Sequence, residues 1–230
     1  MRDPLCTALE DGLAARLPAG SAVAAGTTTG ALAPLAPVEQ AATARMSAGR
    51  LAEFTAGRAA ARRALAALGV PGAEIPAGAD RMPRWPSGYV GSITHAGGLV
   101  LAVAASSQVL RGIGIDLEPA TPLDEDLVGR VCLPGELARF AADTSPAVAA
   151  KLLFSAKESV YKCVAPLAGV FLEFEHVEIF PDVAPGTFRA RGHGPAAPVL
   201  AAGSVQGAWL EAAGGWISAA WEPAAPGPPA

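Results

Sequence analysis

Lysine, cysteine, aromatic residues and charge are all scarce in this sequence of 230 residues. Charged residues make up 17% and the formal net charge is −4, which argues against binding to nucleic acid or anionic membranes, because both require a basic surface. No apolar run approaches the roughly 18 residues of a membrane span. The first residues include acids and lack the apolar core of a signal peptide. We therefore expect a cytoplasmic protein that binds neither nucleic acid nor membrane.

The three cysteines, Cys6, Cys132 and Cys163, are too few and too scattered for a disulfide framework or a zinc site. We expect them to be reduced thiols. Hydrophobic residues make up 51% of the chain, which predicts a real core. The length suits one large domain or two small halves.

The only lysines are Lys151, Lys157 and Lys162, which lie within one segment of twelve residues. Arginine supplies the other positive charges. Because Lys and Arg are not equivalent, this distribution indicates that a compact ammonium group is needed in that segment. The alternative is chance clustering on a solvated helix face.

Hydrophobic periodicity predicts two long helices, one from about residue 38 to 68 and one over 146–165. The first 40 residues contain helix-like and turn-like pieces broken by proline and glycine. Short helical turns are expected over 123–145. Strands are predicted at 89–95, 99–105, 112–118, 171–180, 187–191, 199–205, 208–211 and 216–221.

An internal echo suggests two related halves. After each predicted long helix, two strands flank an Ala-Gly-Gly turn, in SITH-AGG-LVLAVAA and in AWLEA-AGG-WISAAW. We expect an α+β fold of two similar helix-plus-antiparallel-sheet halves related by a pseudo-two-fold, with a site in the cleft between them. The predicted halves are 1–118 and 119–222, and 223–230 is expected to be a disordered tail.

Asp116 and Glu118 end a predicted strand, and their spacing of two places both carboxylates on one face. Two such carboxylates repel unless a cation or a proton lies between them. Oxygen ligands of this kind suit Mg²⁺, especially when phosphate and water complete the coordination. The alternative is a solvated strand edge.

Glu158 and Lys162 are four residues apart on the second long helix. Glu158 also lies at helical spacing from aromatic residues that should face inward. Lys157 adjoins Glu158. The alternative is an ordinary ion pair on a helix surface.

Arg58 falls on the apolar stripe of the first long helix, where a guanidinium needs an anionic partner. Arg50 lies eight residues earlier and can flank the same ligand. The alternative is that Arg58 snorkels to solvent or pairs with a structural acid.

His95 ends a strand in which Ser92 and Thr94 occupy alternate positions, and it lies next to a glycine turn. Imidazole and hydroxyl groups placed in this way suit phosphate recognition.

Four segments, in this order, resemble the large single-chain 4′-phosphopantetheinyl transferases of the Sfp/EntD type. They are RLAEFTAGRAAARRAL (Arg50–Leu65), PRWPSGYVGSITH (Pro83–His95), GIGIDLE (Gly112–Glu118) and FSAKESVYK (Phe154–Lys162). The resemblance implies Mg²⁺-dependent transfer of the 4′-phosphopantetheine arm of coenzyme A to a serine of an apo acyl or peptidyl carrier protein, with release of 3′,5′-ADP. It also implies a pseudo-dimeric fold with coenzyme A in the cleft.

The resemblance carries roles onto matching residues. Asp116, Glu118 and Glu158 resemble the Mg²⁺ ligands, with Mn²⁺ as a second possible ion, and Glu158 resembles the base that deprotonates the serine, directly or through water. Lys162 resembles the lysine that neutralises the diphosphate, so the catalytic set is Glu158, Lys162 and Asp116. The residues expected to contact coenzyme A are Arg50, Arg58, Ser92, Thr94, His95, Lys157 and Lys162.

One departure concerns the lysine that family members often place shortly before the Trp-Pro pair. This chain has none there, and Arg81 or Arg84 is the candidate replacement. We expect a monomer acting in fatty-acid, polyketide, nonribosomal-peptide or siderophore pathways. Two alternatives stay open: a non-catalytic module that binds coenzyme A or a carrier protein, and another Mg²⁺-dependent nucleotide phosphoester enzyme.

Overall fold

The computed structural model describes residues 3–140, 145–169, 172–182, 186–200 and 204–225. The first half of the fold contains a three-stranded antiparallel sheet of order β1-β3-β2 with helices packed on its two faces. Its elements are α1 (Pro4–Ala14), β1 (Ser21–Thr27), α2 (Pro37–Gln40), α3 (Ala48–Ala67), β2 (Tyr89–Ala96) and β3 (Leu99–Ser106).

The second half contains a five-stranded antiparallel sheet of order β4-β8-β7-β6-β5. Its helices are α4 (Glu125–Val131), α5 (Glu136–Phe140) and α6 (Pro146–Ala168), with the 3₁₀ turns η1 (Phe174–His176) and η2 (Gly194–Ala196). Its strands are β4 (Leu110–Pro119), β5 (Val177–Pro181), β6 (Thr187–Gly192), β7 (Gln206–Ala212) and β8 (Gly215–Pro223).

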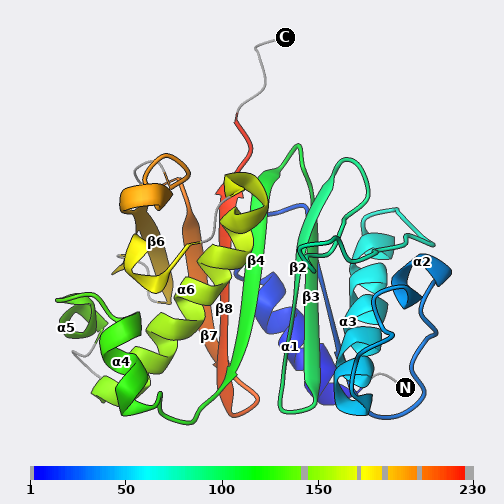
Figure 1. Cartoon of the computed structure of the whole chain (residues 1–230), viewed down its shortest axis with the longest axis horizontal. Helices are drawn as coiled ribbons and strands as arrows, with labels where there is room; N and C mark the ends of the chain where they lie inside the picture. The colour runs from blue at the N-terminus through cyan, green and yellow to red at the C-terminus, as the bar shows by residue number, and fades with distance from the viewer. Residues whose placement is uncertain (1–2, 141–144, 170–171, 183–185, 201–203, 226–230) are drawn as a thin grey trace.

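The core is built in layers because the strands alternate their side chains between two faces. On one face of both sheets, apolar residues of β3, β4 and β8 pack with α1. On the opposite face, α3 covers the first sheet and α6 covers the second. Figure 1 shows α3 beside the first sheet, α6 across the second, and β2 and β4 adjacent at the centre.

The topology contains a repeat that confirms the predicted α+β fold with two similar halves. The order β1-α3-β2-β3 in the first half matches β4-α6-β7-β8 in the second, and the sheet orders β1-β3-β2 and β4-β8-β7 correspond. Both hairpins close through two residues of positive φ, Gly97 and Gly98 in one and Ala213 and Gly214 in the other, as type I′ turns require. Strand β4 is hydrogen-bonded to β8 and so belongs to the second sheet. The predicted boundary between the halves at residue 118 stays a prediction.

Two hydroxyl groups join the facing edges of the sheets. Ser92 Oγ on β2 accepts a hydrogen bond from Ile115 N on β4 at 3.1 Å, and Thr94 Oγ1 accepts one from Leu117 N at 3.2 Å. Both hydroxyl groups are buried. The junction between the halves is thus fixed by side chains that satisfy otherwise unpaired strand amides.

Several predicted boundaries are wrong. The helix predicted from residue 38 is interrupted: α2 ends at Gln40 and α3 begins at Ala48, because Ser47 accepts a hydrogen bond from Arg50 N as an N-cap. The second long helix continues past Pro166 and ends at Ala168, before the left-handed Gly169.

The remaining differences lie near the end of the chain. Strand β5 begins at Val177, later than predicted. Val199 and Leu200 lie in a turn after η2, not in the predicted strand over 199–205, of which 201–203 lie outside the described residues. The predicted disordered tail falls largely on 226–230, which also lie outside them. In the described part of the chain, no helix has the length and hydropathy to cross a bilayer.

Candidate functional site

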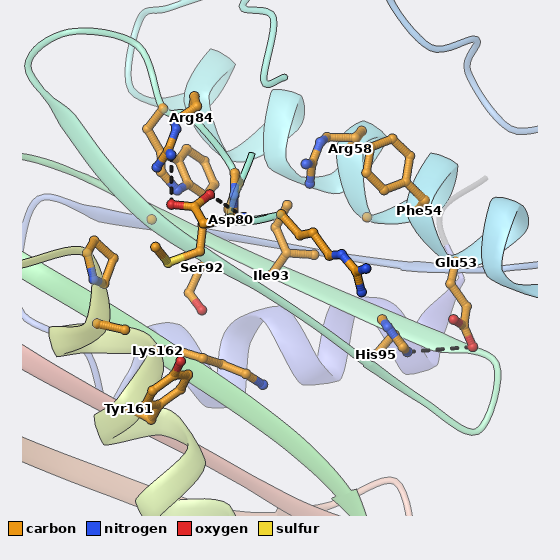
Figure 2. Close-up of a pocket in the computed structure, with 18 of the residues that line it drawn as sticks. Glu53, Phe54, Arg58, Asp80, Arg84, Ser92, Ile93, His95, Tyr161 and Lys162 are labelled. Atoms are coloured by element: carbon orange, nitrogen blue, oxygen red, sulfur yellow. Dashed lines mark hydrogen bonds and ion pairs between the residues drawn. The ribbon is translucent and has the colours of Figure 1, made fainter. Parts of the chain in front are cut away.

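A cavity of about 380 Å³ lies where α3, β2, the loop over 80–85 and α6 meet. Five residues expected to bind coenzyme A line this arginine-lined cavity, namely Arg50, Arg58, Ser92, His95 and Lys162. Figure 2 shows Tyr161 and Lys162 on α6 facing the side chains of α3 and β2 across it. The structure therefore brings together residues that are more than a hundred positions apart in the sequence.

Cations outnumber carboxylates in this cavity. Its lining contains Arg50, Arg58, Arg81, Arg84 and Lys162 against Glu53 and Asp80. The whole chain carries a net charge of −4, whereas the lining of this cavity carries a net positive charge. An apolar pocket with several convergent cations suits a ligand that carries several phosphate charges.

Arg58 is the most buried of these cations, with 5% of its surface exposed. Its guanidinium lies 4.3 Å from the centre of the Phe54 ring, and its Nε has no hydrogen-bond partner among the described residues. Burial lowers the pKa of Arg58 to about 10, with the charges of Arg50 and Arg62 adding to the shift and Glu39 opposing it. Arg58 takes part in no ion pair of the described chain, and Glu39, the carboxylate that favours its charged form, is itself paired with Arg62.

His95 and Arg50 form the rim of the cavity. Arg50 Nη1 lies 2.8 Å from His95 Nε2 and 3.2 Å from Glu53 Oε2, and His95 Nδ1 lies 3.6 Å from Glu53 Oε1. Burial lowers the pKa of His95, the cations Arg50 and Lys162 add to this effect, and Glu53 opposes it. An anion bound here would offset the repulsion from the two cations and favour the imidazolium form.

The loop before β2 contributes residues that the sequence identified only as alternatives. Arg84 Nη2 pairs with Asp80 Oδ2 at 2.7 Å, while Arg81 has a left-handed backbone with φ of 66°. Both line the cavity, and Arg81 also lines an adjoining groove of about 960 Å³ with Arg45 and Arg50.

Trp85 and Tyr161 line the cavity as well, and neither was predicted as a site residue from the sequence. A signal for Trp85 exists in Gly91, a glycine inside β2: a Cβ there would overlap the indole ring and the Val103 carbonyl.

An acidic cluster adjoins the cavity, and Lys162 is shared by both. Lys162 Nζ donates to Asp116 Oδ1 at 2.6 Å, while Asp116 Oδ2 is buried with no hydrogen-bond partner in the described residues. Glu118 pairs with Lys151 at 2.6 Å. Burial raises the pKa of Glu158; Lys162 opposes the shift, and the charges of Asp116 and Glu118 add to it. The charges of the other two predicted metal ligands thus both act on Glu158.

Two glycines bring this cluster together. A Cβ at Gly114 on β4 would overlap Ser159 O and lie 2.5 Å from Cys163 N on α6, and one at Gly112 would lie 2.6 Å from Cys163 O. Helix α6 can therefore lie directly on β4, which places Lys162 beside Asp116. The GIG of GIGIDLE serves close helix–strand packing.

Metal binding by these residues stays a prediction. Within the described ranges, no three His, Cys, Asp or Glu side chains are grouped closely enough to hold a metal ion. Lysines neutralise two of the carboxylates instead. The donor chemistry nevertheless fits a hard cation, because the cluster offers only carboxylate oxygens and one of them, Asp116 Oδ2, is buried without a partner.

Two predicted contacts to coenzyme A lie away from the arginine-lined cavity. Lys157 is 1% exposed and pairs with Glu136 at 2.8 Å; burial lowers its pKa, and Glu136 opposes the shift. Thr94 is buried at the junction with β4, and the hydroxyl of Ser92, although Ser92 lines the cavity, is bonded to the same strand. All three lysines of the chain form ion pairs with carboxylates, and Lys151 and Lys157 are buried, so they do not form a solvated helix face.

The structure thus defines a class, an α+β protein of two repeated halves with a cation-rich cavity at their junction. Comparison with known proteins identifies the family. Residues 38–105 match the 4′-phosphopantetheinyl transferase N-terminal domain, and residues 112–208 match the 4′-phosphopantetheinyl transferase superfamily. The chain belongs to the 4′-phosphopantetheinyl transferase family.

Individual relatives agree. The chain is 42% identical over 160 residues to the 4′-phosphopantetheinyl transferase Svp of Streptomyces mobaraensis, covering 68% of this chain and 65% of that protein. It is 38% identical over 151 residues to the 4′-phosphopantetheinyl transferase Npt of Nocardia iowensis, covering 66% and 68%. It is 41% identical over 123 residues to enterobactin synthase component D of Salmonella typhimurium, covering 49% and 47%. The matches to Svp and Npt span about two thirds of those proteins.

Proposed function

We propose that this protein transfers the 4′-phosphopantetheine arm of coenzyme A to a serine hydroxyl of an apo acyl or peptidyl carrier protein and releases 3′,5′-ADP. Family membership supports the reaction, and one observation supports its location. Lys162 lines the arginine-lined cavity and also pairs with Asp116, so it joins an anion-binding pocket to an acidic cluster. Group transfer from a diphosphate needs both at one place.

In this proposal the arginine-lined cavity binds the phosphates of coenzyme A. Arg58 is buried against Phe54 with an unsatisfied Nε, which makes it a preorganised anion contact. Arg50 and His95 at the rim supply two further donors. Arg81 and Arg84 take the place of the family lysine before the Trp-Pro pair, because both line the cavity. Thr94 acts by holding β2 to β4.

Asp116, Glu118 and Glu158 would hold Mg²⁺ or Mn²⁺, with phosphate oxygens completing the coordination. When bound, the ion would neutralise charge on the diphosphate during transfer. Lys162 would stabilise the leaving 3′,5′-ADP, since its ammonium lies at the border between the cavity and the carboxylates. Lys151 balances the charge of Glu118.

Glu158 would accept the proton of the carrier serine, directly or through water. Its burial and its acidic neighbours raise its pKa, which makes its carboxylate a stronger base than an exposed one. A positioned base contributes roughly 10²–10⁴-fold to such reactions. The remaining expectations are also proposals: a cytoplasmic monomer with halves at 1–118 and 119–222.

The test is incubation of the purified protein with coenzyme A, Mg²⁺ and a panel of apo carrier proteins, read by intact mass. The proposal predicts that at least one carrier gains the mass of one phosphopantetheine arm. Glu158→Gln should abolish this gain, while Glu211→Gln, an exposed acid on β7, serves as the matched control and should keep it. Tight coenzyme A binding without any mass gain would identify a binding module, and phosphate release from nucleotides alone would identify another phosphoester enzyme.

A further inference from the structure

Two fully buried glutamates hold matching sets of partners in the two halves. In the first half, Glu39 accepts hydrogen bonds from Ala36 N at 2.9 Å and Ile75 N at 3.0 Å. It also forms an ion pair with Arg62 at 2.5 Å. Its side chain has no exposed surface, so this glutamate fixes three segments at one point.

In the second half, Glu136 accepts hydrogen bonds from Leu133 N at 2.6 Å and Ile179 N at 2.7 Å. It forms an ion pair with Lys157 at 2.8 Å. Its side chain also has no exposed surface. We call these two arrangements the Glu39 clamp and the Glu136 clamp.

The clamps correspond in every part. Each glutamate bonds the amide three residues before it and follows a proline by two positions, in APVE and in LPGE. Each cation lies on the long helix of its half, Arg62 on α3 and Lys157 on α6. The second amide bonded by each glutamate belongs to an isoleucine that follows the long helix of that half in the chain. The same arrangement built twice indicates a shared role within the repeated fold.

The Glu39 clamp holds the start of the loop that lines the arginine-lined cavity. Ile75 lies five residues before Asp80, the first residue of this loop, and Pro76 O accepts a hydrogen bond from Arg84 N at 2.8 Å. Arg62 also donates to Pro34 O at 3.0 Å, which ties the preceding segment to α3. The clamp thus connects α3, which carries Arg58, to the loop that carries Arg84.

The Glu136 clamp holds a different wall. Lys157 Nζ donates to Glu136 Oε2, to Val131 O at 2.7 Å and to Phe174 O at 3.1 Å. An ammonium has three N–H donors, so the three oxygens satisfy it completely, whereas the five donors of arginine would not be satisfied. Phe174 lines a smaller cavity of about 130 Å³, and so does Glu158.

We propose that the clamps are positioning devices for two separate walls of the active site. The Glu39 clamp positions the wall that binds the phosphates of coenzyme A. The Glu136 clamp positions the wall beside Glu158, and Lys157 acts there without touching coenzyme A. The inference rests on the proposed function for its kinetic test.

The test compares two isosteric variants, Glu39→Gln and Glu136→Gln, each of which is the matched control of the other. Glu39→Gln should raise the KM and the Kd for coenzyme A by about tenfold or more with little change in kcat. Glu136→Gln should lower kcat by about tenfold or more with little change in the KM or the Kd for coenzyme A. A lower Tm in both variants with unchanged kinetics, or the same kinetic change in both, would overturn the proposal.

Two further measurements keep the test decisive. If a single variant does not fold, the uncharged pairs Glu39→Gln/Arg62→Met and Glu136→Gln/Lys157→Met replace it, since removing both charges avoids an unpaired buried ion. If the wild-type protein transfers nothing, the proposed function fails. The clamp proposal is then decided by the Kd for coenzyme A, which must rise in Glu39→Gln and stay unchanged in Glu136→Gln; any other result overturns it.

Discussion

Replacement of Gly114 by alanine should separate α6 from β4 and disable the site without touching any charged residue. The new methyl group would overlap Ser159 O and lie 2.5 Å from Cys163 N and 3.0 Å from Lys162 C. These are backbone atoms, so the helix itself must move, by more than about 1 Å to bring Ser159 O back to ordinary contact. Overpacking of this kind costs about 1–3 kcal/mol of the free energy of unfolding.

The kinetic effect should exceed the stability effect. A shift of about 1 Å in catalytic groups can lower a rate by about 100-fold, and both Glu158 and Lys162 move with α6. The assay is kcat for carrier modification together with Tm. Gly129→Ala on α4 is the matched control, because a Cβ there meets nothing within 4 Å, and it should keep kcat and Tm. Wild-type kcat and Tm in Gly114→Ala would refute the argument that this glycine sets the approach of α6.

Three further predictions follow from the site. Arg58→Ala should raise the Kd for coenzyme A at least about tenfold in calorimetry while the protein stays folded, since charge-assisted hydrogen bonds contribute about 1.5–3 kcal/mol; an unfolded variant would favour a structural role for Arg58. With divalent metal removed, the pKa of Glu158, followed by NMR, should lie above that of an exposed glutamate, because burial raises it. Lys162→Met should raise this pKa further, because Lys162 lowers the pKa of Glu158, and an unchanged pKa would contradict the assignment.

The fold could be predicted where local chemistry decides it. Both type I′ hairpins follow from glycine-containing turns between apolar runs, and β4 follows from its alternation of glycine or acid with Ile or Leu. The start of α3 was misplaced because alanine-rich sequence continues the apparent periodicity, whereas the Ser47 cap decides where the helix begins. The residues after η2 read as a strand by composition, but backbone hydrogen bonds to Ala196 make them a turn.

The cations of the site could be predicted from the sequence better than the residues that surround and position them. Arg58 was conspicuous because a guanidinium interrupts an apolar stripe. Lys157 and Glu158 are adjacent in sequence, yet successive helix residues point about 100° apart. Lys157 therefore pairs with Glu136, whereas the charges that act on Glu158 are those of Lys162, Asp116 and Glu118. The role of Glu136 depends on partners more than 20 residues away, which local patterns do not report.

Binding of a single divalent ion by Asp116, Glu118 and Glu158 is the central claim, and Mn²⁺ titration with coenzyme A present tests it most directly. Electron paramagnetic resonance of free Mn²⁺ should give one bound ion per chain in the wild-type protein and in Glu211→Gln. Asp116→Asn and Glu158→Gln should lose that ion while they remain folded. Undiminished Mn²⁺ binding by both variants, or full transfer activity after chelation of all divalent metal, would contradict the account.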